Sequence, residues 1–209
     1  MNRRCDGIIN CNDKSDENGC NVIDIDESNY RKEQSPTNTI ANKKLEITTS
    51  FDIFTITQFR EVGQSFNINF LISVTWVDYR LTFKNLKESV HKNVIGVKQK
   101  ESLWIPPLVF NNSEETTMLS IHRGLHQPIV NMFVERLGSF EVADPSFLDE
   151  TYFYKGTENP LLLKTEYNMI LHCNYKLEDY PFDTQICTME VRINKFNKRH
   201  NQIHYFPFM

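Results

Sequence analysis

FNINFLISVTW, residues 66–76, alternates between two sets of side chains with a period of two. Successive side chains of a β-strand point to opposite faces, so this pattern predicts a strand with one buried face. The face that we expect to be buried carries Phe66, Ile68, Phe70, Ile72, Val74 and Trp76. The opposite face carries Asn67, Asn69, Leu71, Ser73 and Thr75.

Two stretches in the C-terminal half alternate in the same way. They are LKTEYNMIL, residues 163–171, and the residues from Cys187 to Ile193. No stretch carries an apolar stripe with helical spacing over three turns. Residues 137–159 are rich in Gly, Asp, Glu and Pro and predict a long connection with one short strand. The sequence therefore predicts one all-β domain, a sandwich, from about residue 45 onward.

The composition limits the function classes. The chain has 209 residues, 40% of them hydrophobic, which suffices for one domain of about 150 residues and an accessory piece. With 23 basic and 27 acidic residues no large basic face is expected, so nucleic acid is not an expected partner. No run of about 18 apolar residues occurs and residues 1–7 lack an apolar core, so neither a transmembrane helix nor a signal peptide is expected. No catalytic motif is recognised, and we predict no enzyme.

The five cysteines form two groups: Cys5, Cys11 and Cys20, then Cys173 and Cys187. In an oxidising compartment an odd number leaves one thiol without a partner, so we interpret the sequence as a piece of a longer protein. Around the first group lie Asp6, Asp13, Asp16 and Glu17. Dense carboxylates beside cysteines favour calcium over zinc because no CxxC pair is present; a solvated acidic tail is the alternative.

CDGIINCNDKSDENGC, residues 5–20, resembles the second half of an LDL-receptor class A repeat. The resemblance implies a Cys5–Cys20 disulfide and leaves Cys11 unpaired in this fragment. It also implies calcium ligands from the side chains of Asp6, Asn10, Asp16 and Glu17 and from the carbonyls of Arg3 and Ile8. Asn10 stands where the family has Asp, and the lost charge predicts weak calcium binding. We accordingly divide the chain into a half-module (1–20), a linker (21–40) and a main domain (41–209).

CNYKLEDYPFDTQIC, residues 173–187, places two cysteines around thirteen residues. A disulfide across this loop would stabilise the fold by roughly 3 kcal/mol through the entropy of the unfolded chain. Tyr180-Pro181 favours a turn. A disulfide-closed hairpin is therefore predicted, and a catalytic cysteine is not, because a paired sulfur is no nucleophile.

The spacing of these cysteines, with Pro-Phe-Asp at 181–183, resembles the hallmark loop of the Cys-loop (pentameric) ligand-gated ion channels. WVDYRL (76–81) is similar to the W-x-D-x-x-L of that family, and LWIPPLVFNN (103–112) to its W-x-P-x-x-x-x-x-N segment. The resemblance covers about residues 41–196. It implies an immunoglobulin-like β-sandwich of about ten strands in a homo- or hetero-pentamer. A small neurotransmitter-like agonist would bind between subunits, on the extracellular side of the plasma membrane, and gate a pore formed by helices outside this sequence.

The resemblance also assigns residues to the agonist site. Loop A falls on Phe110 with Asn111 and Asn112, although Phe110 is equally well placed as a core residue. Loop D falls on Leu71, which is not aromatic and puts a cation–π contact in doubt. Loop B falls on Asn194, where an aromatic residue is common, and the nearest one is Phe196.

Other residues take supporting roles in the resemblance. Pro181, Phe182 and Asp183 would couple the loop to the pore, with a turn-stabilising role as the alternative for Asp183. Trp76 and Trp104 are expected in the core, and Asp78 as a structural partner of a neighbouring strand. Asn111-Asn112-Ser113 is a glycosylation sequon with Asn111 as acceptor.

The residues DTQ (183–185) and Arg80 look more like the anion-selective branch than the nicotinic one. Two rival interpretations remain open. One is a secreted binding protein of the same fold without a pore. The other is an adhesion or scaffold protein that uses the LDL-receptor class A module to bind a protein partner.

Overall fold

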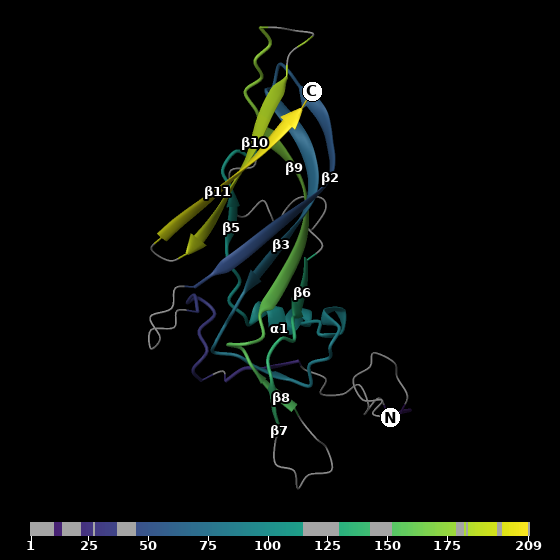
Figure 1. Cartoon of the computed structure of the whole chain (residues 1–209), viewed down its shortest axis with the longest axis vertical. Helices are drawn as coiled ribbons and strands as arrows, with labels where there is room; N and C mark the ends of the chain where they lie inside the picture. Colours follow the sequence, from purple (N-terminus) through teal and green to yellow (C-terminus); the bar gives the residue numbers. More distant parts are fainter. Residues whose placement is uncertain are drawn as a thin grey trace. The chain divides into compact units, whose positions relative to one another are not determined.

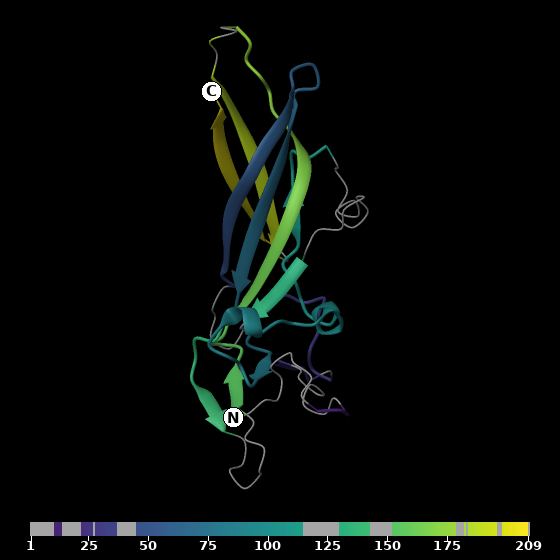
Figure 2. The same ribbon diagram turned by 90° about the vertical axis from the view of Figure 1, so that its right-hand side faces the viewer.

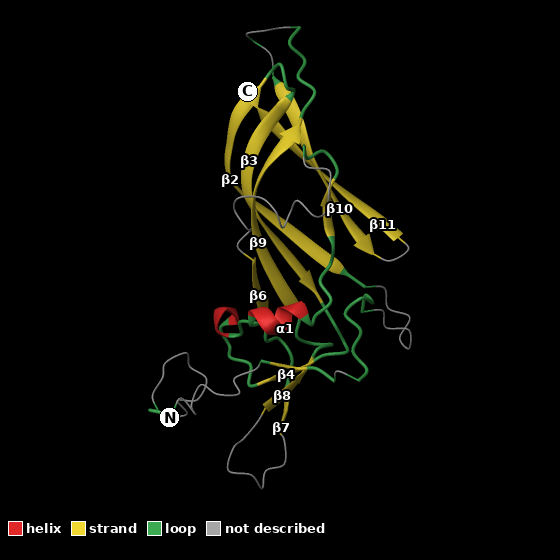
Figure 3. Cartoon of the chain, turned by 180° about the vertical axis from the view of Figure 1, so that it is seen from behind, coloured by secondary structure: helices red, strands yellow, loops and turns green. Residues whose placement is uncertain are grey.

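The computed structural model describes residues 11–13, 22–26, 28–36, 45–114, 130–142, 152–178, 182, 184–195 and 198–208. Their regular secondary structure is almost entirely β, with eleven strands and two short helices (Figures 1 and 3). The helices are η1 (Val90–Lys92), which is a 3-10 helix, and α1 (Val97–Glu101). Neither of these helices has the length and apolar character needed to cross a membrane.

The strands form three sheets, which Figures 1 and 2 show from two sides. The first has the order β1 (Ile23–Asp24), β4 (Thr82–Lys84), β8 (Tyr152–Lys155) and β7 (Phe140–Val142). The second has the order β2 (Ile47–Arg60), β3 (Ser65–Trp76), β9 (Leu161–His172) and β6 (Val130–Val134). The third has the order β11 (Lys198–Phe208), β10 (Gln185–Lys195) and β5 (Leu108–Phe110).

The chain divides into two compact units. The first consists of Met1–Thr48, Val74–Leu103 and Asn131–Leu163. The second consists of Thr49–Ser73, Trp104–Val130 and Lys164–Met209. The sheet β1-β4-β8-β7 belongs to the first unit, and the sheet β11-β10-β5 to the second.

In the first unit, residues 22–26 and 28–36 are part of the folded structure. Strand β1 pairs with β4 through Ile23 and Phe83, and the ring of Tyr30 is buried. The carbonyl oxygens of Arg31 and Gln34 accept hydrogen bonds from the guanidinium of Arg80. The interpretation of residues 21–40 as a linker is therefore wrong for 22–26 and 28–36. The polar composition of this stretch gave no indication of the few side chains that contact distant residues.

The expected long connection at 137–159 contains two short strands, β7 and β8, instead of one. They pair antiparallel, with Phe140 opposite Tyr154. The ring of Phe140 also lies edge-on to Tyr152, with 4.9 Å between the centroids. Aromatic pairs across the strands thus stabilise the pairing of β7 with β8. The composition of this stretch, rich in Gly and Asp, did not indicate a second strand.

In the second unit the predicted alternations are confirmed. The apolar face of β3 is buried, and Cys187, Met189, Val191 and Ile193 of β10 are buried in phase. Phe70 of β3 and Tyr167 of β9 meet Phe110 of β5, with ring centroids 5.7 and 5.2 Å away. Aromatic side chains from two sheets thus form one core. The all-β sandwich fold is therefore confirmed.

Candidate functional site: the root of the disulfide loop

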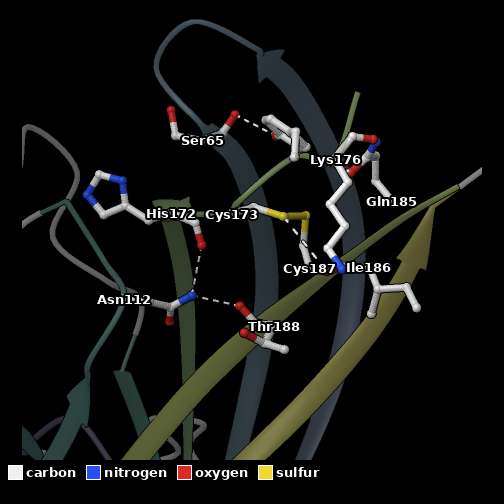
Figure 4. The surroundings of a disulfide bond; sticks show 10 residues. Ser65, Asn112, His172, Cys173, Lys176, Gln185, Ile186, Cys187 and Thr188 are labelled. Atoms are coloured by element: carbon white, nitrogen blue, oxygen red, sulfur yellow. Dashed lines mark hydrogen bonds between the residues drawn. A yellow bond between two sulfur atoms is a disulfide. The ribbon is translucent and has the colours of Figure 1, made fainter. Parts of the chain in front are cut away.

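The predicted disulfide between Cys173 and Cys187 is present, with the two Cα atoms 5.3 Å apart. Cys173 directly follows β9, and Cys187 lies within β10. Because β9 and β10 belong to different sheets, this bond links the two sheets. The prediction of a disulfide-closed hairpin is therefore wrong: the disulfide is present, but β9 pairs with β3 and β6, and β10 pairs with β5 and β11. Both cysteines are buried. Figure 4 shows the disulfide between them. We call the two cysteines and the residues next to them the loop root.

Hydrogen bonds fix the chain on both sides of this disulfide. The Cys173 amide donates to the Gln64 carbonyl in the β2–β3 turn at 2.8 Å. The Tyr175 hydroxyl donates to the Ser65 carbonyl at 2.8 Å. Burial raises the pKa of Tyr175, and the charge of Glu61 adds to the shift, so this hydroxyl keeps its proton to a higher pH than an ordinary tyrosine does. The start of the loop is thereby held against the β2–β3 turn.

The two arms of the loop are joined by one side chain. The Gln185 amide accepts a hydrogen bond from the Lys176 backbone N–H at 2.9 Å and donates to the Lys176 carbonyl at 2.7 Å (Figure 4). This reciprocal pair resembles a backbone ladder step and closes the loop beyond the disulfide. The predicted coupling residue Phe182 is 92% exposed at the loop tip. Pro181 and Asp183 lie outside the described residues, so the coupling role of all three remains a prediction.

The loop A segment lies next to the loop root. Phe110 pairs with Val191 of β10, and the backbone N–H of Asn111 donates to the Glu190 carbonyl at 2.9 Å. Beyond Asn111 the pairing changes to β9, because the His172 amide donates to the Asn112 carbonyl at 2.7 Å. Ser113 then forms an antiparallel bridge with Leu171. The chain thus leaves one sheet and joins the other at Asn112.

The structure places Phe110 in the core, as the alternative interpretation expected. Only 6% of its surface is exposed, and its ring lies edge-on to both Phe70 and Tyr167. Burial raises the pKa of Tyr167 to about 12, which keeps this hydroxyl neutral in the cluster. Asn111 is exposed, so the sequon asparagine is accessible.

Leu71 lies on the face of β3 opposite Trp76, as predicted, and is half-buried. On the same face, the side-chain oxygens of Asn67 and Asn69 are buried and have no hydrogen-bond partner among the described residues. Sequence reasoning assigned these asparagines only to a polar face. An unpaired buried oxygen depends on the neighbouring strands and has no sequence signal of its own.

Asp78 is fully buried and paired with Arg80. This confirms a structural role, although its partners are Arg80 and Tyr30 and not a residue of a neighbouring strand. Trp76 and Trp104 are buried, as expected for core residues.

The remaining predicted positions are largely outside the described part of the chain. Asn194 lies near the end of β10, but its side chain is not described, and Phe196 lies outside the described residues. So do Cys5, Cys20 and the six calcium residues, Asp6, Asn10, Asp16, Glu17, Arg3 and Ile8. Cys11 is exposed and is a free thiol. Within the ranges that the structure describes, no group of His, Cys, Asp and Glu side chains is arranged to hold a metal ion.

The family described as neurotransmitter-gated ion-channel ligand binding domain matches residues 22–142. A search of curated proteins found no match. The family match begins at the residue before β1 and includes WVDYRL and the loop A segment. It covers more than half of the chain, and the disulfide loop follows it in the sequence. The chain therefore belongs to the family of neurotransmitter-gated ion-channel ligand-binding domains.

Proposed function

We propose that this chain is the extracellular ligand-binding region of a channel subunit, in which an agonist bound between subunits of a pentamer opens a transmembrane pore. The observation that carries the proposal is the loop root, together with the family match. A disulfide links the two sheets there, hydrogen bonds hold the loop against the β2–β3 turn, and the loop tip presents the exposed ring of Phe182. A loop fixed at its base and exposed at its tip suits the transfer of a movement to another domain.

The face of β3 that carries Leu71 is the proposed complementary side of the agonist site. It offers no aromatic ring to a cation, but it holds the unpaired oxygens of Asn67 and Asn69. Burying a hydrogen-bond acceptor without a partner is costly, but both oxygens are closed to solvent, so a ligand that donates hydrogen bonds gains affinity there only if the surrounding chain opens. An amine or an amino acid has such donors. The proposed agonist class is therefore a small molecule with an ammonium group.

Anion selectivity is the favoured ion preference, but one of the two features that supported it has a structural explanation. Arg80, one of the two features behind it, is bonded to the buried Asp78, which is a sufficient structural reason for an arginine at this position. The preference rests on the residues DTQ (183–185) alone.

Weak calcium binding by residues 1–20 is also proposed, because the set of predicted ligands includes the neutral Asn10. Calorimetry on a peptide of residues 1–22 is expected to show no more than weak binding. Micromolar affinity for calcium would contradict the proposal.

The main test combines assembly and binding. The chain, secreted from insect cells, would be examined by mass photometry for pentamers and by thermal shift against a panel of amines and amino acids. We expect a pentamer population and a ligand-dependent rise in melting temperature that Asn69→Ala reduces. Gln58→Ala, on the exposed strand β2, is the matched control and should leave the shift unchanged. A chain that stays monomeric and responds to no member of the panel would contradict the proposal and favour the adhesion interpretation.

A further inference from the structure

Residues 108–114 are shared between two sheets, and we call them the cross-sheet segment. Phe110 and Asn111 are bonded to β10, whereas Ser113 and Glu114 are bonded to β9 through Leu171 and Ile170. A segment that is paired in this way cannot shift relative to one sheet without straining its bonds to the other.

Asn112 lies at the point of change and has bonds to both sheets. Its side-chain Nδ2 donates to the His172 carbonyl of β9 at 3.1 Å and to the Thr188 carbonyl of β10 at 2.7 Å (Figure 4). Its Oδ1 accepts a hydrogen bond from the Glu190 backbone N–H at 3.1 Å. His172 and Thr188 are the immediate chain neighbours of Cys173 and Cys187. The asparagine therefore joins the same two strands as the disulfide, one residue away from each sulfur-bearing residue.

We infer that Asn112 is a positioning residue that makes the cross-sheet segment and both strands of the loop root move as one body. The inference deepens the proposed function, since Asn112 is the last of the three residues assigned to loop A of the agonist site. A displacement of loop A would reach the disulfide loop through this amide and not only through the general packing of the sandwich.

The chemistry of the side chain explains why an asparagine is needed. Both Nδ2 hydrogens and Oδ1 are engaged, which uses the two donors and the acceptor of a primary amide. Aspartate has nearly the same shape but no donor, and its charge would face two carbonyl oxygens. Asn112→Asp therefore removes the two donated hydrogen bonds, to His172 of β9 and Thr188 of β10, while it retains an acceptor for the Glu190 N–H of β10. Asn111 has an exposed side chain, so Asn111→Asp is a control with the same chemical change one residue away.

The test uses the full chain made in the bacterial periplasm, where the disulfide forms and no N-glycan is attached. Two quantities are compared among the wild type, Asn112→Asp and Asn111→Asp. One is the rate at which dithiothreitol reduces Cys173–Cys187 under native conditions, followed by alkylation and mass spectrometry. The other is hydrogen exchange in the segments 108–114, 170–176 and 185–192. Gly156→Ala, in the first unit, controls for a general loss of stability.

Because Asn112→Asp loses two hydrogen bonds, we expect its Cys173–Cys187 disulfide to be reduced about tenfold faster than that of the wild type. We also expect all three segments to lose protection from hydrogen exchange together. Asn111→Asp should match the wild type, and Gly156→Ala should not reproduce the pattern at the loop root. Loss of protection confined to 108–114, or a reduction rate equal to that of Asn111→Asp, would overturn the inference. Neither measurement needs a ligand. A failed search for an agonist would therefore count against the proposed function and not against the positioning role of Asn112.

Discussion

The substitution Asp78→Asn tests the buried ion pair that fixes residues 30–34 to the first unit. Asp78 accepts hydrogen bonds from Arg80 at 2.8 Å (Nε to Oδ1) and 2.7 Å (Nη2 to Oδ2), and from the Tyr30 hydroxyl at 3.0 Å. Arg80 in turn lies 4.4 Å from the centroid of the Tyr30 ring and donates to the carbonyls of Arg31 and Gln34. Burial lowers the pKa of Arg80, but the hydrogen bond and charge of Asp78 outweigh it, and the pKa is raised.

The expected loss of stability follows from the charge of Arg80, which Asp78→Asn leaves without its partner. Removing one partner of a buried ion pair costs about 3–5 kcal/mol, because the other charge stays buried without compensation. The side chain of Arg80 is 15% exposed, so water can compensate part of that loss. We therefore expect the free energy of unfolding to fall by roughly 2–4 kcal/mol. Tyr30→Phe removes the hydrogen bond donated to Asp78 and the one accepted from Arg80 at 3.4 Å, and should cost about 1–2 kcal/mol.

Urea unfolding would measure these differences, and hydrogen exchange would show whether residues 28–36 lose protection. The double variant Asp78→Asn/Arg80→Met leaves no buried charge and should be more stable than Asp78→Asn alone. A cost below about 0.5 kcal/mol for Asp78→Asn would refute the reasoning, since that is the range of an ordinary surface substitution. A double variant no better than the single one would refute the assignment of the cost to an unpaired Arg80.

Three further predictions concern other parts of the chain. Gly156→Ala should lower the free energy of unfolding in urea by about 1–3 kcal/mol, because a Cβ there would collide with the backbone carbonyl oxygens of Asp78 and Leu81; an unchanged value would contradict this. The raised pKa of Tyr167, about 12, means that its contribution to stability is complete below pH 10 and lost as pH rises toward 12. Tyr167→Phe should remove that alkaline loss, and an identical pH profile would count against it. Asn111→Gln should abolish a glycosidase-sensitive mobility shift of the secreted chain, and a shift that survives would exclude Asn111 as the acceptor.

Periodicity and spacing were enough to predict the central strands and the disulfide. Alternation identified the buried face of β3 and placed Leu71 on the other face, because a strand's two faces follow from its sequence alone. The spacing of Cys173 and Cys187 identified the loop that links the sheets. These signals are local in the sequence, so they can be interpreted without knowledge of the fold.

The features that the sequence did not predict depend on distant partners. Tyr30 is 48 residues from Asp78, and Asn112 is 60 and 76 residues from His172 and Thr188. Nothing in the polar stretch 22–36 indicates that it contacts the body of the unit. Likewise, the change of sheet at Asn112 arises from where β9 and β10 lie, and the sequence showed only an asparagine in a motif. Phe110 fitted both a core and a ligand role until its ring contacts were known.

The most direct test of the channel proposal is to sequence the full-length transcript that contains this reading frame. For a channel subunit we expect the coding sequence to continue beyond Met209 into four apolar stretches of about 20 residues, each long enough to cross a bilayer as a helix. A stop codon before any such stretch would contradict the channel proposal, and a secreted ligand-binding protein of the same fold would take its place.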